Sequence, residues 1–360
     1  MSVVVPTYKE AANIPTLLER LAAVRETHGL DMEVLIMDDN SRDGSVEEVQ
    51  KFGAPWVKIV VRTENRGLSP AVTQGLYEAT KEVVLVMDAD LSHPPEKIPE
   101  LLHELEGGAD FVIGSRYTPG GSTNDDWGFL RWLNSRIATL LARPLTSAHD
   151  PMAGFFAMRR ARLEGVTLNA IGYKIGLELI VKCNLVRVSE VPIHFLDRVR
   201  GESKLTLGEQ LRYLQHLRRL YIHKFGGWSE LVQFAVVGSS GIIVNLVVLR
   251  ALVELGVSSN IAVAVAIGVS MISNFFLNRR FTFSHARGES IVMQFLGFTA
   301  ACALGAVLNY VVTLWVKRAA PSLPLEVAAL AGVAAGLILN FLTNRYLVFK
   351  RKHYRSQGAA

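Results

Sequence analysis

The chain has 360 residues, half of them apolar, and carries a net charge of +5 with a pI near 9.2. Its two cysteines, Cys183 and Cys302, lie far apart in the sequence and exclude both a disulfide framework and a cysteine-ligated metal site. The basic charge would suit nucleic acid, but the sequence has no helix-turn-helix, zinc or RNP-type pattern, so we expect no nucleic acid partner.

The apolar residues are unevenly distributed along the chain. Residues 1–227 mix charged and apolar side chains like an ordinary globular domain, whereas long stretches after Trp228 carry almost no charge. We therefore expect a boundary near Gly226-Gly227, and the length suits about two domains. Met1 leads directly into an apolar run without the charged region of a signal peptide, which predicts that the first domain stays in the cytoplasm.

The first part of the chain alternates short apolar runs with segments of helical spacing. Strands are expected at 3–5, 33–37, 57–61, 83–87 and 109–113, and helices at 11–27, 69–81 and 95–106. Continuous β-branched runs separated by helices are typical of a mostly parallel sheet that is covered on both faces. The sequence thus predicts an α/β fold whose ligands bind beyond the carboxyl ends of the strands.

Polar clusters follow four of these strands, at the edge where a ligand would bind. They are Tyr8/Glu10, Asp38/Asp39, Asp88/Asp90 and Arg116. Each cluster alone also fits an ordinary turn or helix cap, and for Asp38-Asp39 that interpretation stays open. Four clusters in succession instead indicate a binding site.

Asp88 and Asp90 come directly after the strand at 83–87, with one residue between them. Side chains two positions apart on an extended chain point the same way, so both carboxylates can meet one ion. Mg²⁺ and Mn²⁺ prefer such oxygen ligands together with phosphate oxygens. We therefore expect one of these metals at Asp88 and Asp90, with Ser92 as a further ligand, and a loop role for His93.

Eight motifs in order carry a resemblance to a known family. They are VVVPTYKE, MDDNSRDGS, NRGLSPAV, VMDADLSHPP, GSRYTPGG, DPMAGFFAM, GYKIGLE and FLDRVRGESKL. From the N-terminus to about Lys204 the chain resembles the polyprenol (dolichol) phosphate mannosyltransferases, which are inverting family-two glycosyltransferases with the Rossmann-like GT-A fold. The resemblance implies transfer of mannose from GDP-mannose to polyprenyl phosphate. A UDP-sugar donor such as UDP-glucose stays an alternative, because related transferases share these motifs.

The resemblance also implies roles for individual residues. The donor nucleotide-sugar would be bound by Pro6, Tyr8, Glu10, Asp38, Asp39, Lys174, Arg198 and Lys204. The acceptor phosphate would be bound by Arg116, Arg131 and Ser135, and the catalytic set would be Asp88, Asp90, Arg116 and Arg131. The chain departs from the family pattern at Ser92, where some relatives have glutamine, and at Ala153 and Phe156, where serine and arginine are common.

The chemistry of the acceptor explains these residue types. A phosphate monoester is already anionic at neutral pH, since its second pKa lies near ~6, and it needs no strong base to become a nucleophile. Guanidinium groups bind phosphate through two parallel hydrogen bonds, and Arg116, Arg131 and Arg198 supply them. Catalysis would then depend on positioning and electrostatic stabilisation.

Residues 206–227 form the expected connection to the second domain. Leu207, Leu211, Leu214 and Leu217 recur at helical spacing, which predicts an amphipathic helix. Such a helix would lie in the membrane interface. Packing on the enzyme domain is the alternative.

The rest of the chain contains four apolar segments, near 231–255, 261–277, 291–316 and 327–342. A membrane crossing takes ~20 apolar residues. Gln233-Phe234 recurs as Gln294-Phe295, and Asn274 to Arg279 recurs as Asn340 to Arg345, so we expect two copies of a helical hairpin. The region resembles the GtrA-like four-helix domains.

Basic residues follow the second and fourth apolar segments, and the positive-inside rule then places both termini and the central loop in the cytoplasm. We expect an integral protein of the cell membrane with three parts: a GT-A domain at 1–205, a linker helix at 206–227 and an all-α transmembrane domain at 228–360. A lipid-linked sugar transporter or flippase with a degenerate nucleotide domain is the alternative from another class. The presence of Asp88, Asp90, Arg116 and Arg131 argues against degeneracy.

Overall fold

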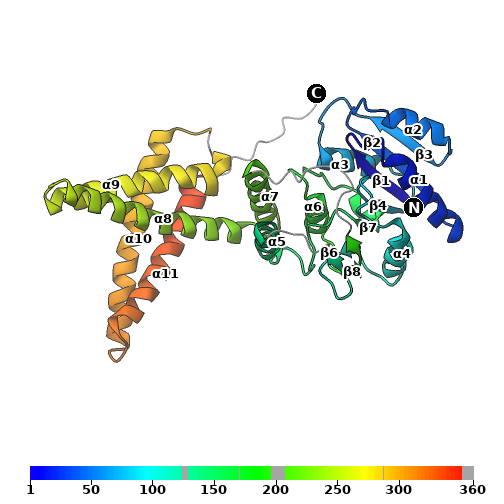
Figure 1. The fold of residues 1–360 in the computed structure, drawn as a ribbon. Coiled ribbons are helices and arrows are strands. Elements are labelled where there is room, and N and C mark those ends of the chain that lie inside the picture. Colours follow the sequence, from blue (N-terminus) through cyan, green and yellow to red (C-terminus); the bar gives the residue numbers. More distant parts are fainter. Residues whose placement is uncertain (124–128, 170, 196–206, 287, 351–360) are drawn as a thin grey trace, which may run out of the picture. The chain divides into compact units, whose positions relative to one another are not determined.

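The computed structural model describes residues 1–123, 129–169, 171–195, 207–286 and 288–350. For residues 123, 129–133, 135 and 207 it describes the backbone but not the side chains. The chain forms two compact units, Met1–Lys224 and Phe225–Ala360 (Figure 1). The first is an α/β unit and the second is helical, so the expected fold class is confirmed.

A seven-stranded sheet forms the centre of the α/β unit, in the order β3-β2-β1-β4-β7-β5-β8. The strands are β1 (Ser2–Thr7), β2 (Glu33–Asp38), β3 (Val57–Val61), β4 (Val83–Val86), β5 (Phe111–Ser115), β7 (Phe156–Arg159) and β8 (Val188–Pro192). All neighbours pair in parallel except β7, which runs antiparallel to β4 and β5. Two short strands, β6 (Ser122–Thr123) and β9 (His194–Phe195), form a separate parallel pair.

Helices cover both faces of this sheet. They are α1 (Ile14–Thr27), α2 (Ser45–Phe52), α3 (Leu68–Glu78), α4 (Ile98–Glu106) and α6 (Ile175–Lys182). The unit also contains α5 (Phe129–Ala142) and α7 (Leu207–Phe225). Successive residues of β1 belong to opposite layers: Val3 and Val5 pack with α1 and α4, whereas Val4 packs with α3 and α6. This alternation explains why the strand reads as a continuous apolar run, since both of its faces are buried.

Strand β7 differs from the sequence-based expectation. No strand is expected at Phe156–Arg159, yet it lies between β4 and β5 in the middle of the sheet. Its apolar residues are as buried as those of its parallel neighbours. The apolar composition of this segment indicates that it is buried. It does not indicate the direction of the strand, because the direction depends on the path of the preceding chain.

Helix α7 packs on the α/β unit. The hydroxyl of Tyr213 donates to the carbonyl of Ala138 in α5 at 2.7 Å, and that of Tyr221 donates to Leu141 at 2.8 Å. On the side facing α6, His216 Nε2 lies 3.0 Å from the buried Glu178 carboxylate. The faces of α7 that carry Tyr213, Tyr221 and His216 therefore pack on the enzyme domain, which was the alternative to a position in the membrane interface.

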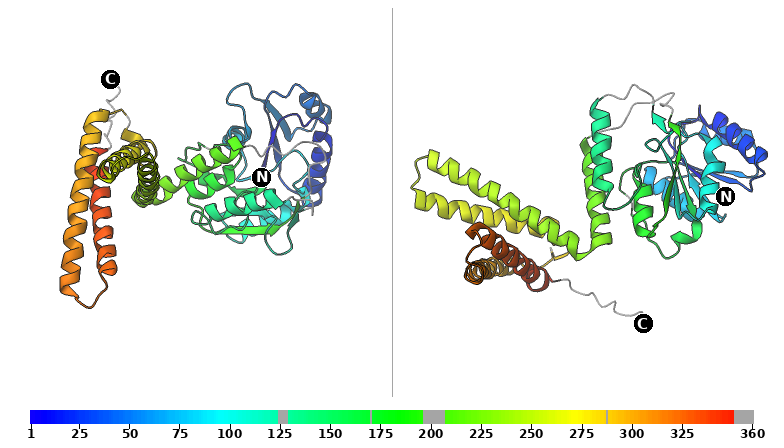
Figure 2. Two further views of the ribbon diagram at one scale, coloured as in Figure 1. Left: turned by 60° about the vertical axis from the view of Figure 1, so that its left-hand side comes forward. Right: turned by 90° about the horizontal axis from the view of Figure 1, so that it is seen from below.

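The second unit consists of two long helical hairpins. Helices α8 (Gly227–Glu254) and α9 (Ser259–Leu277) lie side by side, as do α10 (Ile291–Ala319) and α11 (Leu325–Thr343) (Figure 2). Each of the four is long and apolar enough to cross a membrane. Short π-helices, Asn278–Thr282 and Asn344–Val348, extend α9 and α11 in the same way and support the expected repeat.

The two hairpins are joined by a reciprocal pair of polar contacts. Glu230 Oε2 lies 3.0 Å from Arg345 Nε, and Gln294 Oε1 lies 2.8 Å from Arg279 Nε, so each arginine binds the first helix of the other hairpin. Glu230 and Gln294 are thus equivalent, and the expected equivalence of Gln233 with Gln294 is wrong by one helical turn. A two-residue motif is too short to fix the register of a helix.

An aromatic cluster lies near these contacts. It contains three pairs of residues related by the repeat: Phe234 and Phe298, Phe275 and Phe341, and Phe283 and Phe349. Deeper in the hairpins, Asn274 lies against Gly241 and Asn340 against Gly305, where a larger side chain than glycine would collide. Close helix contact through small residues is typical of membrane proteins, where lipid provides no hydrophobic drive between helices.

Candidate functional site

A cavity of about 1140 Å³ opens beyond the carboxyl ends of β1, β4 and β5 in the α/β unit. Among the expected site residues, its lining contains Pro6, Tyr8, Glu10, Asp39, Asp88, Asp90, Arg116 and Lys174. Helices α5 and α7 complete it with Asn134, Ile137, Ala138, Leu141, Glu209, Gln210, Tyr213 and Leu214. The rule for open α/β sheets predicts this position, because the polar loops after the parallel strands converge there.

Tyr8 and the cations around it form one part of the lining. The guanidinium of Arg66 lies 5.3 Å from the centroid of the Tyr8 ring, and Lys9 Nζ lies 5.5 Å from it. The ring itself is 44% exposed. An exposed aromatic face beside cations suits a planar, negatively charged ligand such as a nucleotide.

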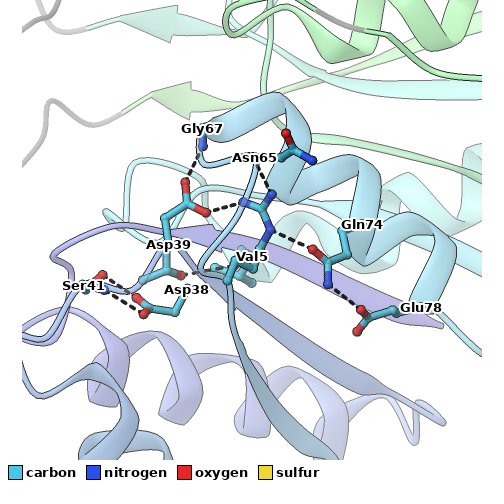
Figure 3. A network of polar contacts seen from close by, with 10 residues as sticks. Val5, Asp38, Asp39, Ser41, Asn65, Gly67, Gln74 and Glu78 are labelled. Carbon is cyan, nitrogen blue, oxygen red and sulfur yellow. Dashed lines mark hydrogen bonds and ion pairs between the residues drawn. The ribbon is translucent and has the colours of Figure 1, made fainter.

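Asp39 is held by a buried arginine that the sequence analysis did not single out. Arg62 pairs with Asp39 Oδ1 through Nη1, while its Nε donates to Gln74 at 2.9 Å and its Nη2 to the carbonyl of Asn65 at 2.8 Å. Asp39 Oδ2 accepts the N–H of Gly67 at 2.6 Å, as Figure 3 shows. Arg62 therefore fixes both an acidic lining residue and the loop that carries Arg66.

Asp38 has a different environment from its neighbour. Its carboxylate accepts hydrogen bonds from the hydroxyl of Ser41 and, at 2.9 Å, from the Ser41 N–H (Figure 3). Asp38 is 1% exposed and is absent from the cavity lining. The sequence left open whether Asp38-Asp39 is only a turn. In the structure Asp38 stabilises the turn, whereas Asp39 lines the cavity.

The acidic pair after β4 lies at the cavity in a tight turn. Asp90 Oδ1 accepts the Ser92 hydroxyl at 2.5 Å and the Ser92 N–H at 3.1 Å. Ser92 is 1% exposed and supports Asp90 rather than lining the cavity. The backbone at Leu91 is left-handed, with φ of +64°, which brings Ser92 back onto Asp90.

His93 does more than serve its loop. Its Nδ1 accepts the N–H of Asp88 at 2.9 Å, its ring stacks on Phe155, and it borders the cavity. Burial lowers the pKa of His93, because the interior disfavours the imidazolium form, although Asp88 and Asp90 oppose this effect. The ring is therefore neutral.

Two carboxylates at one cavity suit a divalent ion. In the part of the chain that the structure describes, no group of three or more His, Cys, Asp and Glu side chains could hold a metal by itself. Magnesium is commonly bound by one or two carboxylates plus substrate phosphates, so Asp88 and Asp90 fit an ion that arrives with a phosphorylated ligand. Their donor set is therefore chemically adequate.

Arg116 enters the cavity from the end of β5 and is anchored by Asp150. Its Nε and Nη2 donate to the two Asp150 oxygens at 2.7 and 2.8 Å, and Asp150 is fully buried. Burial opposes the charge of Arg116, but the bond to Asp150 outweighs this effect and raises the pKa of the guanidinium. Arg116 is thus a fixed, permanently cationic group.

Lys174 lies just before α6, on the cavity wall. Burial and the nearby Arg116 lower its pKa to about 8. At neutral pH the ammonium form still predominates, because the pH lies below this value. Lys174 therefore adds a second cation to the side of the cavity that contains Arg116.

Four expected site residues have no described side chain. Arg198 and Lys204 lie outside the described residues, and Arg131 and Ser135 lie on α5 with side chains outside the description. Other residues of α5, among them Asn134 and Ala138, line the cavity, so this helix borders the site.

Several lining or supporting residues escaped sequence reasoning. Arg66 and Asp150 stand inside two of the quoted motifs, where their position beside Gly67 and Pro151 gave a usable signal. No local sequence pattern marks Glu209 and Tyr213 as lining residues, because α7 reaches the cavity only through its packing on α5 and α6.

Comparison with known proteins places this geometry in a family. Over 354 residues the chain is 39% identical to the dolichol-phosphate mannosyltransferase of Pyrococcus furiosus, and the match covers 97% of this chain and 99% of that protein. The chain belongs to the dolichol-phosphate mannosyltransferase family. The family member of Saccharomyces cerevisiae is 45% identical over 65% of this chain and 91% of its own length.

Both units also match family models. Residues 2–166 match "Glycosyl transferase family 2" and residues 233–356 match "GtrA/DPMS, transmembrane domain". This dolichol-phosphate mannosyltransferase family member is therefore a glycosyltransferase and an integral membrane protein. A solved glucosyl-3-phosphoglycerate synthase from Mycobacterium tuberculosis, in complex with Mn²⁺, UDP and phosphoglyceric acid, is 20% identical over 62% of this chain and 78% of its own, with a TM-score of 0.47.

Proposed function

We propose that the protein transfers mannose from GDP-mannose to dolichyl phosphate with inversion at the anomeric carbon. The observation that carries this proposal is one cavity lined by a carboxylate pair, Asp88 and Asp90, and by two cations, Arg116 and Lys174. Such a cavity suits two phosphorylated reactants that repel each other in solution. The names of the 39–45% identical relatives supply the sugar and the lipid.

The donor would bind at the acidic end of the cavity. Pro6, Tyr8, Glu10 and Asp39 would border the guanine base, and Asp38 would support them through its turn. A divalent ion bound by Asp88 and Asp90 would neutralise the diphosphate leaving group. Arg198 and Lys204 remain proposed contacts of the donor phosphates or sugar.

The acceptor phosphate would bind at Arg116, with Arg131 and Ser135 of α5 as further contacts. Because Asp150 fixes the guanidinium, Arg116 presents its charge without first having to be ordered. The phosphate would attack the anomeric carbon directly, since it is anionic at neutral pH and no base has to remove a proton. Lys174 would hold negative charge on the phosphates during the transfer.

An apolar rim offers a place for the lipid chain. Ile137 and Leu141 of α5 and Leu214 of α7 line the cavity and are 48%, 38% and 50% exposed. Exposed apolar groups at the mouth of a polar cavity indicate a ligand with an apolar part. An isoprenoid attached to the acceptor phosphate fits this requirement.

A donor panel tests the proposal. Purified full-length protein in detergent receives dolichyl phosphate, Mg²⁺ or Mn²⁺ and radiolabelled GDP-mannose, UDP-glucose or UDP-N-acetylglucosamine. We expect label in the organic phase from GDP-mannose, and none from an Asp90→Asn variant. Transfer from a UDP-sugar alone would favour the alternative donor, and no transfer from any donor would refute the function.

We also propose that the α/β unit and both termini lie on the cytoplasmic side. The basic residues Arg279, Arg280 and Arg345 at the ends of the second and fourth spans support this orientation. Labelling a single cysteine placed at position 356 with an impermeant maleimide tests it. If the maleimide labelled this cysteine in intact cells, the C-terminus would lie outside the cell and the proposed topology would be wrong.

A further inference from the structure

His93 is a buried side chain at the cavity whose position none of the proposed roles uses. It follows the acidic pair in the turn after β4, and its side chain is 3% exposed. Nδ1 accepts the backbone N–H of Asp88 at 2.9 Å, so this nitrogen carries the lone pair and the neutral ring carries its proton on Nε2. The hydrogen bond alone thus sets the tautomer.

Two aromatic rings fix the orientation of the imidazole. The ring of Phe155 stacks on it at a centroid distance of 5.3 Å and an angle of 14°, and Phe195 meets it edge-on at 5.8 Å. These contacts come from the segments before β7 and at β9, far from His93 in the sequence. The imidazole cannot rotate away from Asp88 without losing both.

Gly154 provides the space for this arrangement. A Cβ at position 154 would lie 3.3 Å from His93 Cε1, which is tighter than most such contacts, and 3.4 Å from Asp88 Oδ2, which is already in van der Waals contact. The glycine therefore lets the imidazole and the Asp88 carboxylate pack against the same piece of backbone. Asp88 Oδ2 lies 3.9 Å from His93 Nδ1.

The turn between Asp88 and Asp90 is consequently held at both ends. Ser92 binds the Asp90 carboxylate, and His93 binds the Asp88 backbone. We propose that His93 is a positioning residue, whose Nδ1 holds the Asp88 N–H and so sets the direction in which the Asp88 carboxylate meets a divalent cation. This inference rests on the proposed function, in which Asp88 and Asp90 bind the metal.

Three substitutions separate the hydrogen bond from the ring. His93→Asn keeps an acceptor oxygen at the distance of Nδ1 from the backbone. His93→Gln moves its oxygen one bond further out, and His93→Phe keeps a ring that stacks on Phe155 but has no acceptor. The exposed His103 on α4 gives a matched control through His103→Phe.

The probe is Mn²⁺ in the presence of GDP, titrated into full-length protein in detergent. The electron paramagnetic resonance signal of free Mn²⁺ measures binding without any turnover. We expect His93→Asn to bind Mn²⁺ within a factor of about three of wild type. His93→Gln and His93→Phe should bind about tenfold or more weakly, the typical loss when a residue that orients a metal ligand is removed.

The outcomes separate the positioning role from the proposed function. Wild-type protein that binds no Mn²⁺ with GDP would refute the metal site itself. Wild-type binding with equally tight binding by His93→Phe and His93→Gln would overturn the role of His93 alone. If His93→Phe does not fold, His93→Asn against His93→Gln remains decisive, because equal affinities in these two variants contradict the proposal.

Discussion

The buried carboxylate of Asp150 grips the guanidinium of Arg116 at two points, 2.7 and 2.8 Å from Nε and Nη2. Glu190 in turn accepts the N–H of Asp150 at 2.8 Å. The Nε and Nη2 edge of the Arg116 guanidinium is thus hydrogen-bonded within the protein, and these two bonds fix the plane of the whole planar group. A phosphate bound by Arg116 would meet an oriented group.

Asp150→Asn should therefore damage both stability and acceptor binding. The amide has nearly the same shape but leaves the buried cation without its counter-charge, which costs about 3 kcal/mol of unfolding free energy. We expect a higher KM for dolichyl phosphate with little change in the KM for the donor. Denaturation in detergent and initial rates measure these quantities, and wild-type stability together with wild-type acceptor KM would contradict the argument.

We expect substitution of Arg62 to change the KM for the donor and not the KM for the acceptor. Its guanidinium joins Asp39, Gln74 and the carbonyl of Asn65, and a lysine cannot reach three partners at fixed angles. We expect Arg62→Lys to raise the KM for GDP-mannose by about tenfold, which corresponds to about 1.4 kcal/mol. The matched control is Arg159→Lys, because this half-exposed arginine pairs with Glu82 and does not line the cavity. An equal rise in the acceptor KM would instead show that the substitution disturbs the whole cavity, and it would contradict a donor-specific role for Arg62.

Lys174 predicts a pH dependence of donor capture. Its pKa is lowered to about 8, so the group is a cation below that pH and becomes neutral as the pH rises through it. Because kcat/KM reports the free enzyme, its value for the donor should fall above about pH 8. Lys174→Arg keeps its charge and should move the decline to higher pH. A profile that is unchanged in Lys174→Arg would assign the decline to another group.

The reciprocal contacts of the membrane unit predict unequal effects of two substitutions of Gln294. Gln294 is 3% exposed, accepts a hydrogen bond from Arg279 and donates one to the carbonyl of Ala286 at 2.9 Å. Gln294→Leu removes both bonds, whereas Gln294→Glu loses the donor but keeps an acceptor for Arg279, as Glu230 does in the other contact. We expect Gln294→Leu to lower the melting temperature in detergent more than Gln294→Glu does. The hydrogen bond to a charged group is worth about 1.5–3 kcal/mol. Equal melting of both variants would show that the contact carries no stability.

Much of the fold follows from local patterns. The apolar runs of β1, β2 and β4 and the acidic pair after β4 are readable because burial on both faces needs continuous apolar residues and a ligand needs polar loops after them. Strand β7 is apolar in the same way, and its antiparallel direction cannot be read from composition. The long apolar helices are equally visible, whereas their register is not.

The sequence by itself determined the two kinds of domain, the acidic pair and the cationic character of the site, because these depend on residue type and on periodicity along the chain. Tertiary structure alone decided that Arg62 holds Asp39, that Asp150 holds Arg116 and that His93 holds Asp88. The first two contacts join residues separated by more than twenty positions, and the third needs a left-handed turn and two distant phenylalanines. Hydrogen bonds between such partners depend on where the folded backbone carries them, and no local spacing records that.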